Sequence, residues 1–234
     1  GGLLLAALCL YSSFATFSAT MRNHTTLRYM VNPLNAYYAL ADLAWTSRQA
    51  PDGPPQPVGL DAKLAPLAAG QRPPLLLLVL GETARAANFS LYGYGRPTNP
   101  ELSKLPVLAF SDVSSCGTNT AASVPCMVSH LGREAYVARE RDQENLLDLA
   151  WRAGLAVLWL DNQAGCKGVC ERVPSASTDD AQKTPAGQAL CTEGECLDLL
   201  MLEGLDERIA RLPEDARARG VVLVLHQMGS HGPA

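Results

Sequence analysis

The chain has 234 residues and a formal net charge of −4, from 19 Lys and Arg against 23 Asp and Glu. Hydrophobic residues make up 47% of the chain and charged residues 18%, which excludes a disordered chain, because such chains are poorer in apolar residues and richer in net charge. No segment has the dense run of Lys and Arg that neutralises nucleic-acid phosphates, so we expect no nucleic-acid partner. The length suits one large domain with an appendage.

The first segment, residues 1–21, contains no charged side chain, and residues 3–10 are unbroken Leu, Ala and Cys. About 20 apolar residues span a bilayer as a helix, so we interpret this segment as the end of a transmembrane helix. The alternatives are a signal peptide, which would begin with basic residues, and a buried soluble helix, which would seldom avoid charge for so long. Since the chain begins inside this apolar run and stops after a motif-like stretch, we interpret it as a fragment of a longer protein.

Residues 22–72 predict a connector between this segment and a folded domain. A short helix is expected at residues 36–46. The frequent prolines of residues 50–74 disfavour both helix and sheet, so they predict an extended, Pro-rich linker. We therefore place a domain boundary near residue 73 and expect the N-terminal part of a catalytic domain at residues 73–234.

Residues 73–234 predict an α/β domain. Strands buried on both faces are expected at three continuous apolar runs, residues 75–80, 156–160 and 221–225. Helices are expected at residues 145–153, which Gly154 ends, and at residues 197–212. Strands that alternate with helices imply a mostly parallel sheet flanked by helices, whose chemistry gathers at the carboxyl ends of the strands. The polar residues directly after these strands, Glu82-Thr83, Asp161-Asn162 and residues 226–231, are therefore the candidates for function.

The seven cysteines point to an oxidising compartment. Cys9 lies in the apolar N-terminal run, and the other six fall in three short-range pairs: Cys116 and Cys126, Cys166 and Cys170, and Cys191 and Cys196. The sequence alone does not fix their connectivity, and nearest-neighbour pairing is the simplest choice. A zinc knot is the alternative, because Cys-x3-Cys and Cys-x4-Cys are close to ligand spacing. We favour three disulfides, since a membrane segment makes an exported domain plausible and exported thiols oxidise.

Two stretches offer candidate site residues with open interpretations. Glu82 follows the first strand, where a carboxylate needs a cation such as a metal ion or Arg85, or else caps a helix. Residues 114–126 carry five hydroxyl side chains between and beside two cysteines. They form either a disulfide-tied loop or a hydroxyl nucleophile at a helix start, where backbone amides bind phosphate and a metal ion activates the hydroxyl. Spacing does not choose among these hydroxyls.

Two histidines and one lysine complete the candidates. His226 and His231 are half of the chain's four histidines and lie close together after the third strand. They could bind a metal ion or donate hydrogen bonds to phosphate, or they could pack as ordinary loop residues. Lys167 lies between Cys166 and Cys170 and is a plain surface lysine unless that loop faces the site.

Three blocks carry a family resemblance: LGETARA at residues 80–86, SCGTNTAASVPCM at residues 115–127, and LHQMGSHGP at residues 225–233. Together they resemble the phosphoethanolamine transferases of Gram-negative bacteria. These are inner-membrane enzymes that modify lipid A, the lipopolysaccharide anchor, and they include colistin (polymyxin) resistance enzymes. Residues 28–33 and 143–148 are also similar to the family, so the resemblance covers nearly the whole chain.

The resemblance implies an alkaline phosphatase/sulfatase-like fold, incomplete in this chain, that lies in the periplasm after an inner-membrane domain. It implies that Thr120 is the nucleophile, which takes phosphoethanolamine from phosphatidylethanolamine as a phospho-threonine intermediate and passes it to lipid A. Glu82 and Thr120 match ligands of Zn²⁺. Lys167 and His231 match residues that contact phosphoethanolamine, and His226 is a further candidate. The resemblance also supports the nearest-neighbour disulfides.

The remaining zinc ligands and a later substrate-contacting His would lie beyond Ala234. Two ligands do not complete a four-coordinate zinc site, so we expect weak zinc binding and no transferase activity from this fragment alone. Two alternatives remain open. One is a related superfamily transferase that acts on another periplasmic glycan or on a glycerol-phosphate polymer. The other is a non-catalytic, disulfide-bonded periplasmic domain.

Overall fold

The computed structural model describes residues 2–14, 36–37, 40, 53–192 and 195–229, which fall in two compact units with a boundary between Asp52 and Gly53. The described part of the first unit contains helix α1 (Gly2–Ser12), at the place of the predicted apolar helix. Within the described residues, no helix has the length and apolar character needed to cross a membrane. Residues 15–21 and most of the short helix expected at residues 36–46 lie outside the described residues.

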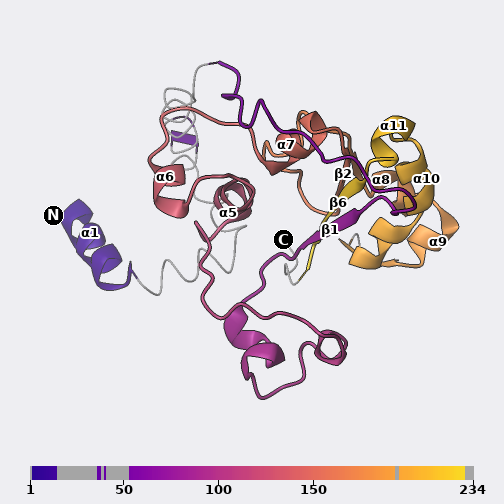
Figure 1. Ribbon diagram of the computed structural model, residues 1–234. Helices are drawn as coiled ribbons and strands as arrows, with labels where there is room; N and C mark the ends of the chain where they lie inside the picture. Colours follow the sequence, from indigo (N-terminus) through magenta and orange to yellow (C-terminus); the bar gives the residue numbers. More distant parts are fainter. Residues whose placement is uncertain (1, 15–35, 38–39, 41–52, 193–194, 230–234) are drawn as a thin grey trace. The chain divides into compact units, whose positions relative to one another are not determined.

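The second unit is built on a parallel four-stranded sheet with the strand order β1-β6-β2-β3 (Figure 1). Its strands are β1 (Leu75–Leu80), β2 (Ala156–Asp161), β3 (Ser175–Ser177) and β6 (Val221–His226). The predicted α/β fold, with a mostly parallel sheet flanked by helices, is therefore confirmed. The predicted second and third strands each extend one residue further, to Asp161 and His226.

The connections between strands carry the helices, which are short. The α-helices are α5 (Thr120–Met127), α6 (Arg133–Val137), α7 (Leu146–Arg152), α8 (Asp179–Gln182), α9 (Pro185–Gln188), α10 (Leu205–Ala210) and α11 (Glu214–Arg217). The 3-10 helices are η1 (Ala86–Asn88), η2 (Ser90–Tyr92), η3 (Leu102–Lys104) and η4 (Asp198–Leu202). A two-stranded antiparallel ribbon pairs β4 (Cys191–Thr192) with β5 (Glu195–Cys196).

Helix α7 confirms the predicted helix at residues 145–153. Asn145 caps its first turn, and Gly154 follows it in the left-handed region (φ 96°). The prediction of one continuous helix at residues 197–212 is wrong. This segment is divided into η4 and α10 because Gly204 adopts a left-handed conformation (φ 66°) that an α-helix cannot contain.

The two central strands separate two hydrophobic cores. Val157 and Trp159 of β2 belong to a core with buried residues of α5, α7 and β6. The alternate residues Leu158 and Leu160 pack with Met201 of η4 and with buried residues before and in α11. Because successive side chains of a strand point to opposite faces, β2 and β6 are buried on both faces, as their apolar runs predict.

Strand β1 differs from its prediction, because it is not buried on both faces. Leu75 is 64% exposed and Val79 is 51% exposed, while Leu78 and Leu80 pack against the core that contains α7. Among the described strands, β1 lies at an edge of the sheet and pairs with β6. A continuous aliphatic run predicts a strand but not which strand lies at the edge.

The described part of the Pro-rich segment, from Gly53 onward, forms turns and irregular structure and belongs to the second compact unit. Gln56 forms a parallel bridge with Gln143, and the amide of Val58 donates a hydrogen bond to the Glu144 carboxylate at 2.9 Å. Arg152 of α7 donates to the carbonyl of Val58 and pairs with Glu144. The segment is thus fastened to α7, and the compact unit begins about twenty residues before residue 73.

Candidate active site

The polar residues after the three long strands meet at one edge of the sheet. Leu80, His226 and Asp161 occupy matching register positions on β1, β6 and β2. The amide of Gln227 donates to the carbonyl of Leu80 at 2.9 Å, which ties the segment after β6 to the end of β1. The sequence prediction that these carboxyl ends converge is therefore confirmed.

Glu82 and Thr120 contact each other directly at this edge. The Thr120 hydroxyl Oγ1 lies 3.0 Å from Oε1 and 2.9 Å from Oε2 of Glu82, although the two residues are 38 positions apart. Of the hydroxyls in residues 114–126, Thr120 is the one that hydrogen-bonds to Glu82. Arg85, the alternative partner of Glu82, makes no hydrogen bond or ion pair to it among the described contacts.

Helix α5 places Thr120. Thr120 is its first residue, and the side chain of Asn119 caps the helix by accepting a hydrogen bond from the amide of Ala122 at 2.8 Å. The disulfide between Cys116 and Cys126 ties the preceding loop to the body of the helix. A hydroxyl at a capped helix start lies among free backbone amides, which favour an anionic oxygen nearby.

His226 lies behind Glu82 and is 1% exposed. Its Nε2 is 3.8 Å from Oε2 of Glu82, and its Nδ1 is 3.4 Å from Oδ1 of Asp161. Its ring meets the edge of Trp159 at a centroid distance of 5.4 Å, and neither ring nitrogen has a hydrogen-bond partner among the described residues. This burial favours a role for His226 that acts through Glu82.

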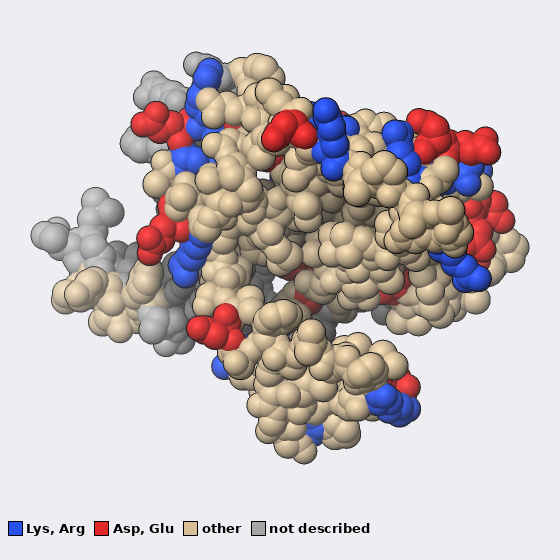
Figure 2. All heavy atoms as spheres, viewed as in Figure 1, with Lys and Arg blue, Asp and Glu red and all other residues tan. Residues whose placement is uncertain are grey.

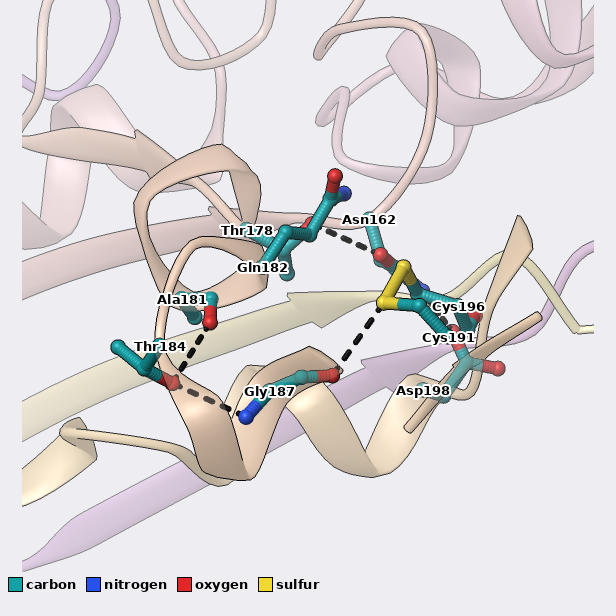
Figure 3. Close-up of a disulfide and its surroundings, with 9 residues drawn as sticks. All are labelled: Asn162, Thr178, Ala181, Gln182, Thr184, Gly187, Cys191, Cys196 and Asp198. Carbon is teal, nitrogen blue, oxygen red and sulfur yellow. Dashed lines mark hydrogen bonds between the residues drawn. A yellow bond between two sulfur atoms is a disulfide. The ribbon is translucent and has the colours of Figure 1, made fainter. Parts of the chain in front are cut away.

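Asp198 completes the support of the site, although no sequence pattern predicts it. Its carboxylate accepts hydrogen bonds from the amides of Met228 and Gly229 at 2.6 and 2.9 Å, and from the Asn162 side chain at 2.9 Å. Figure 3 shows Asp198 beside the disulfide of β4 and β5, with Asn162 also accepting a hydrogen bond from Thr178. The only local feature of Asp198 in the sequence is its position two residues after Cys196, and this does not indicate that it binds the backbone after β6.

Gly229 packs directly against the backbone of Glu82. A Cβ atom at Gly229 would lie 2.7 Å from the carbonyl oxygen and 2.9 Å from the amide nitrogen of Glu82. Gly229 also has φ 60°, and Thr83 next to Glu82 has φ 54°. The segment after β6 therefore fixes the backbone of Glu82, while Asp198 fixes that segment.

Lys167 lies on a loop closed by the disulfide of Cys166 and Cys170. Its Nζ donates to the carbonyl of Ala164 at 2.5 Å, and its side chain lines a cavity of about 310 Å³ together with Ala121, the neighbour of Thr120. The Lys167 loop thus faces the side of the molecule on which α5 begins. His231, the other predicted substrate contact, lies outside the described residues.

The six paired cysteines form the three predicted disulfides, Cys116–Cys126, Cys166–Cys170 and Cys191–Cys196. The zinc-knot alternative is therefore wrong. Each disulfide borders a candidate residue: the first lies beside Thr120, the second encloses Lys167, and the third precedes Asp198. Nearest-neighbour bridges thus stiffen the loops that carry the site.

The donor atoms of this site fit part of a zinc centre. Glu82 supplies a carboxylate and Thr120 a hydroxyl, and carboxylate oxygens are ordinary zinc ligands. In the part of the chain that the structure describes, no three His, Cys, Asp or Glu side chains are grouped to hold a metal ion. Glu82 and Thr120 are the two residues of this site whose oxygens could contribute to holding a metal ion.

Figure 2 shows charges of both signs interspersed over the region that Figure 1 labels α7 to α11. The face drawn there has no broad patch of one sign.

Comparisons with known proteins agree along the chain. Residues 74–234 match the family model described as Sulfatase, and residues 1–47 match the model described as phosphoethanolamine transferase EptA/EptB. The chain is 42% identical to phosphoethanolamine transferase EptA of Escherichia coli over 234 residues, which cover 99% of this chain and 40% of that protein. It is 39% identical to phosphatidylethanolamine transferase Mcr-1 of Escherichia coli over 239 residues, covering 99% and 43%.

A solved structure is similar as well. The integral membrane lipooligosaccharide phosphoethanolamine transferase A (EptA) of Neisseria meningitidis matches with a TM-score of 0.70 and 35% identity, over 98% of this chain and 41% of that one. The chain thus spans about two fifths of the length of the relatives that it matches.

Proposed function

The chain belongs to the sulfatase family, and since its relatives carry the name phosphoethanolamine transferase, we propose that it is part of such an enzyme. In this proposal the enzyme transfers phosphoethanolamine from phosphatidylethanolamine to lipid A. The observation that carries the proposal is the contact of the Thr120 hydroxyl with both carboxylate oxygens of Glu82 at a capped helix start. It supports a hydroxyl nucleophile in an α/β fold of this family.

Thr120 performs the covalent step in this mechanism. Its Oγ1 forms a bond to the phosphorus of phosphatidylethanolamine, and the bond from phosphorus to the diacylglycerol oxygen breaks. The Thr120 hydroxyl proton passes to the Glu82 carboxylate and then to the departing diacylglycerol oxygen, which leaves phosphoethanolamine bound to Thr120. An acceptor oxygen of lipid A then loses its proton and bonds to this phosphorus, the bond from phosphorus to Thr120 Oγ1 breaks, and Oγ1 regains a proton. Splitting one transfer into two displacements is the general advantage of covalent catalysis.

We propose that the reaction depends on Zn²⁺, with Glu82 and Thr120 as two of its ligands. The chemistry that bound zinc supplies at such a site is polarisation of a phosphoryl oxygen and a lowered pKa of a coordinated hydroxyl. His226, buried with its ring nitrogens 3.8 Å from Glu82 and 3.4 Å from Asp161, is a further residue that could hold the Glu82 carboxylate or the metal ion in this proposal.

Lys167 and His231 bind the phosphoethanolamine group in this proposal. Negative charge increases on the phosphoryl oxygens during each displacement, and a fixed cation there stabilises the transition state more than the ground state. The free amides at the start of α5 contribute in the same direction. Lys167 is available for this role, because it has no carboxylate partner among the described ion pairs.

The protein is proposed to act at the bacterial inner membrane, with residues 73–234 in the periplasm and residues 1–21 as the end of a transmembrane helix. Three disulfides favour an oxidising compartment. A membrane location suits a reaction whose donor and acceptor are both lipids. Polymyxin resistance would follow if the added ethanolamine reduces the negative charge that lipid A presents.

The test is lipid A mass spectrometry on cells that express the complete enzyme with Thr120→Ala. The expected result is loss of the phosphoethanolamine adduct, and digestion of the unaltered protein should yield a phosphorylated peptide that contains Thr120. Thr118→Ala is the matched control, since Thr118 is a neighbouring hydroxyl without a described contact to Glu82, and it should leave the adduct in place.

Two other outcomes would select the alternatives. If Thr120 is phosphorylated but lipid A is unmodified, the acceptor is another periplasmic glycan or a glycerol-phosphate polymer. If Thr120→Ala leaves the protein's cellular effect intact, the protein is a non-catalytic periplasmic domain, and the transferase proposal is wrong.

A further inference from the structure

The loop that carries Lys167 is held in an uncommon backbone conformation. Lys167 has φ 53°, in the left-handed region that few non-glycine residues adopt, and the next residue, Gly168, has φ 86°. The amide of Val169 donates to the carbonyl of Cys166 at 3.0 Å inside the disulfide-closed loop. A residue in such a conformation stays there only when its surroundings fix it.

Helix α7 supplies those surroundings through two contacts. The Asn145 side chain donates from Nδ2 to the carbonyl of Val169 at 2.9 Å, inside the loop. Just beyond the loop, Arg172 donates from Nε and Nη2 to the two carboxylate oxygens of Asp148, both at 2.7 Å. The disulfide closes the loop, but these contacts attach it to the core.

The anchor on α7 is itself rigid. Asp148 is 5% exposed and also accepts a hydrogen bond from the Asn145 amide at 2.8 Å, which completes the capping box of α7. Two parallel charge-assisted hydrogen bonds between a guanidinium and a carboxylate fix both distance and orientation. The hydrogen bonds with Asp148 raise the pKa of Arg172, so its guanidinium keeps its positive charge.

The Lys167 loop and its anchor face the same space. Lys167, Asn145 and Arg172 line the 310 Å³ cavity that also reaches Ala121, beside Thr120. A shift of Arg172 would move the loop relative to α5, and with it the cation that the proposed transfer uses.

We infer that Arg172, held by Asp148, is a positioning residue that sets where Lys167 presents its charge to the phosphate group of the donor lipid. The inference rests on the proposed function, because it assumes that Lys167 contacts that phosphate. Arg172 itself does not need to touch the substrate. Arg172 affects the transfer rate because it fixes the position of the loop that carries Lys167.

The test is a double-mutant cycle on the complete membrane-bound protein, with kcat and KM measured on phosphatidylethanolamine. Lys167→Ala should lower kcat/KM by about tenfold or more, as removal of a charge-stabilising donor does. Arg172→Lys keeps the positive charge but loses the two-pronged geometry, and it should lower kcat/KM by about tenfold. In the Lys167→Ala background, Arg172→Lys should cause no further loss.

Two further variants exclude trivial explanations. Arg219→Lys alters an exposed pair with Asp215 and should leave kcat/KM unchanged. Asn145→Ser keeps a side chain that can cap α7 but cannot reach Val169, and it should reproduce the Arg172→Lys effect even if Arg172→Lys folds poorly.

The outcomes separate this inference from the proposed function. If Arg172→Lys lowers kcat/KM by the same factor with and without Lys167, Arg172 acts independently and the inference is wrong. If Lys167→Ala has no effect, the inference is also wrong, while the Thr120→Ala experiment still decides the transfer itself. If Lys167→Ala lowers kcat/KM and Asn145→Ser and Arg172→Lys do not, the loop needs no anchor and the inference is overturned.

Discussion

Replacement of Gly229 by alanine should disturb both the fold and the site, because Gly229 lies against the backbone of Glu82. The new Cβ atom would lie 2.7 Å from the Glu82 carbonyl oxygen and 2.9 Å from its amide nitrogen. Backbone atoms cannot rotate away as a side-chain end can, so Gly229, Glu82 or both must shift. The left-handed φ of 60° at Gly229 adds strain of its own.

The cost has two parts of similar size. An L-residue in the left-handed region costs about 1–2 kcal/mol. Forcing an additional methyl group into a packed position costs about 1–3 kcal/mol more. We therefore expect Gly229→Ala to lower the free energy of unfolding by about 2–5 kcal/mol, or Tm by roughly 6–15 °C for a protein of this size.

Substitutions at two other glycines separate the cost of backbone strain from the cost of the steric clash. Gly70 has φ 79°, and no described heavy atom lies within 4 Å of the place that a methyl group would take there, so Gly70→Ala introduces the strain without the clash. Gly95 has neither feature, so Gly95→Ala should be close to neutral. Thermal unfolding followed by circular dichroism should rank the three variants with Gly229→Ala lowest in Tm, then Gly70→Ala, then Gly95→Ala.

The transfer activity should differ more between Gly229→Ala and Gly70→Ala than their Tm values do. A displaced Glu82 backbone would move the carboxylate away from Thr120 Oγ1, and misplacement of about 1 Å costs roughly a hundredfold in rate. Phosphoethanolamine transfer should therefore fall strongly in Gly229→Ala and stay near normal in Gly70→Ala. Equal Tm losses in these two variants, or full transfer by Gly229→Ala, would refute the proposed packing of Gly229 on Glu82.

Three more expectations concern a disulfide, a tyrosine and the metal. Replacing both Cys191 and Cys196 with serine should lower the free energy of unfolding by about 2 kcal/mol, as loop entropy over a separation of 5 residues implies, and thermal unfolding without reductant measures it. Burial raises the pKa of Tyr136 above its ordinary 10.0. The folded protein therefore holds the tyrosine proton more tightly than the unfolded chain does, and the free energy of unfolding decreases as the pH rises from 10 through the folded-state pKa. Tyr136→Phe should therefore flatten the alkaline fall in Tm, and an unchanged profile would contradict this. Calorimetric titration of the 234-residue chain with Zn²⁺ should detect only weak binding that Glu82→Gln weakens further, and a tight stoichiometric site would contradict it.

The parts of the fold that the sequence predicts are those that depend on local pattern. Residues 75–80, 156–160 and 221–225 form strands, as predicted, because continuous apolar runs favour parallel strands. The meeting of Asp161 and His226 at one edge follows because parallel strands end at the same side of a sheet. The three disulfides agree with nearest-neighbour pairing, which is the simplest of the connectivities that the sequence leaves open.

The parts that were not predicted depend on contacts between distant residues. The exposure of β1 depends on strand order, which a single apolar run does not contain. Spacing alone does not distinguish Thr120 from the neighbouring hydroxyls, and only the family resemblance identifies it, because its contact with Glu82 lies 38 positions away. The break at Gly204 needs knowledge that this glycine is left-handed, because leucine spacing on both sides of it is compatible with one helix.

The site depends on a series of contacts that runs from a disulfide to the nucleophile. Cys196 pairs with Cys191 close to Asp198, Asp198 binds the amide of Gly229, and Gly229 packs on the backbone of Glu82. The Glu82 carboxylate then accepts a hydrogen bond from the Thr120 hydroxyl. Loss of the β4–β5 disulfide acts on Thr120 through several intervening contacts, so we expect it to displace Thr120 only slightly. A methyl group at Gly229 acts on Glu82 directly and should displace it more. A transfer defect in Gly229→Ala that exceeds the defect in the Cys191/Cys196 double variant is the pattern that this order of contacts requires.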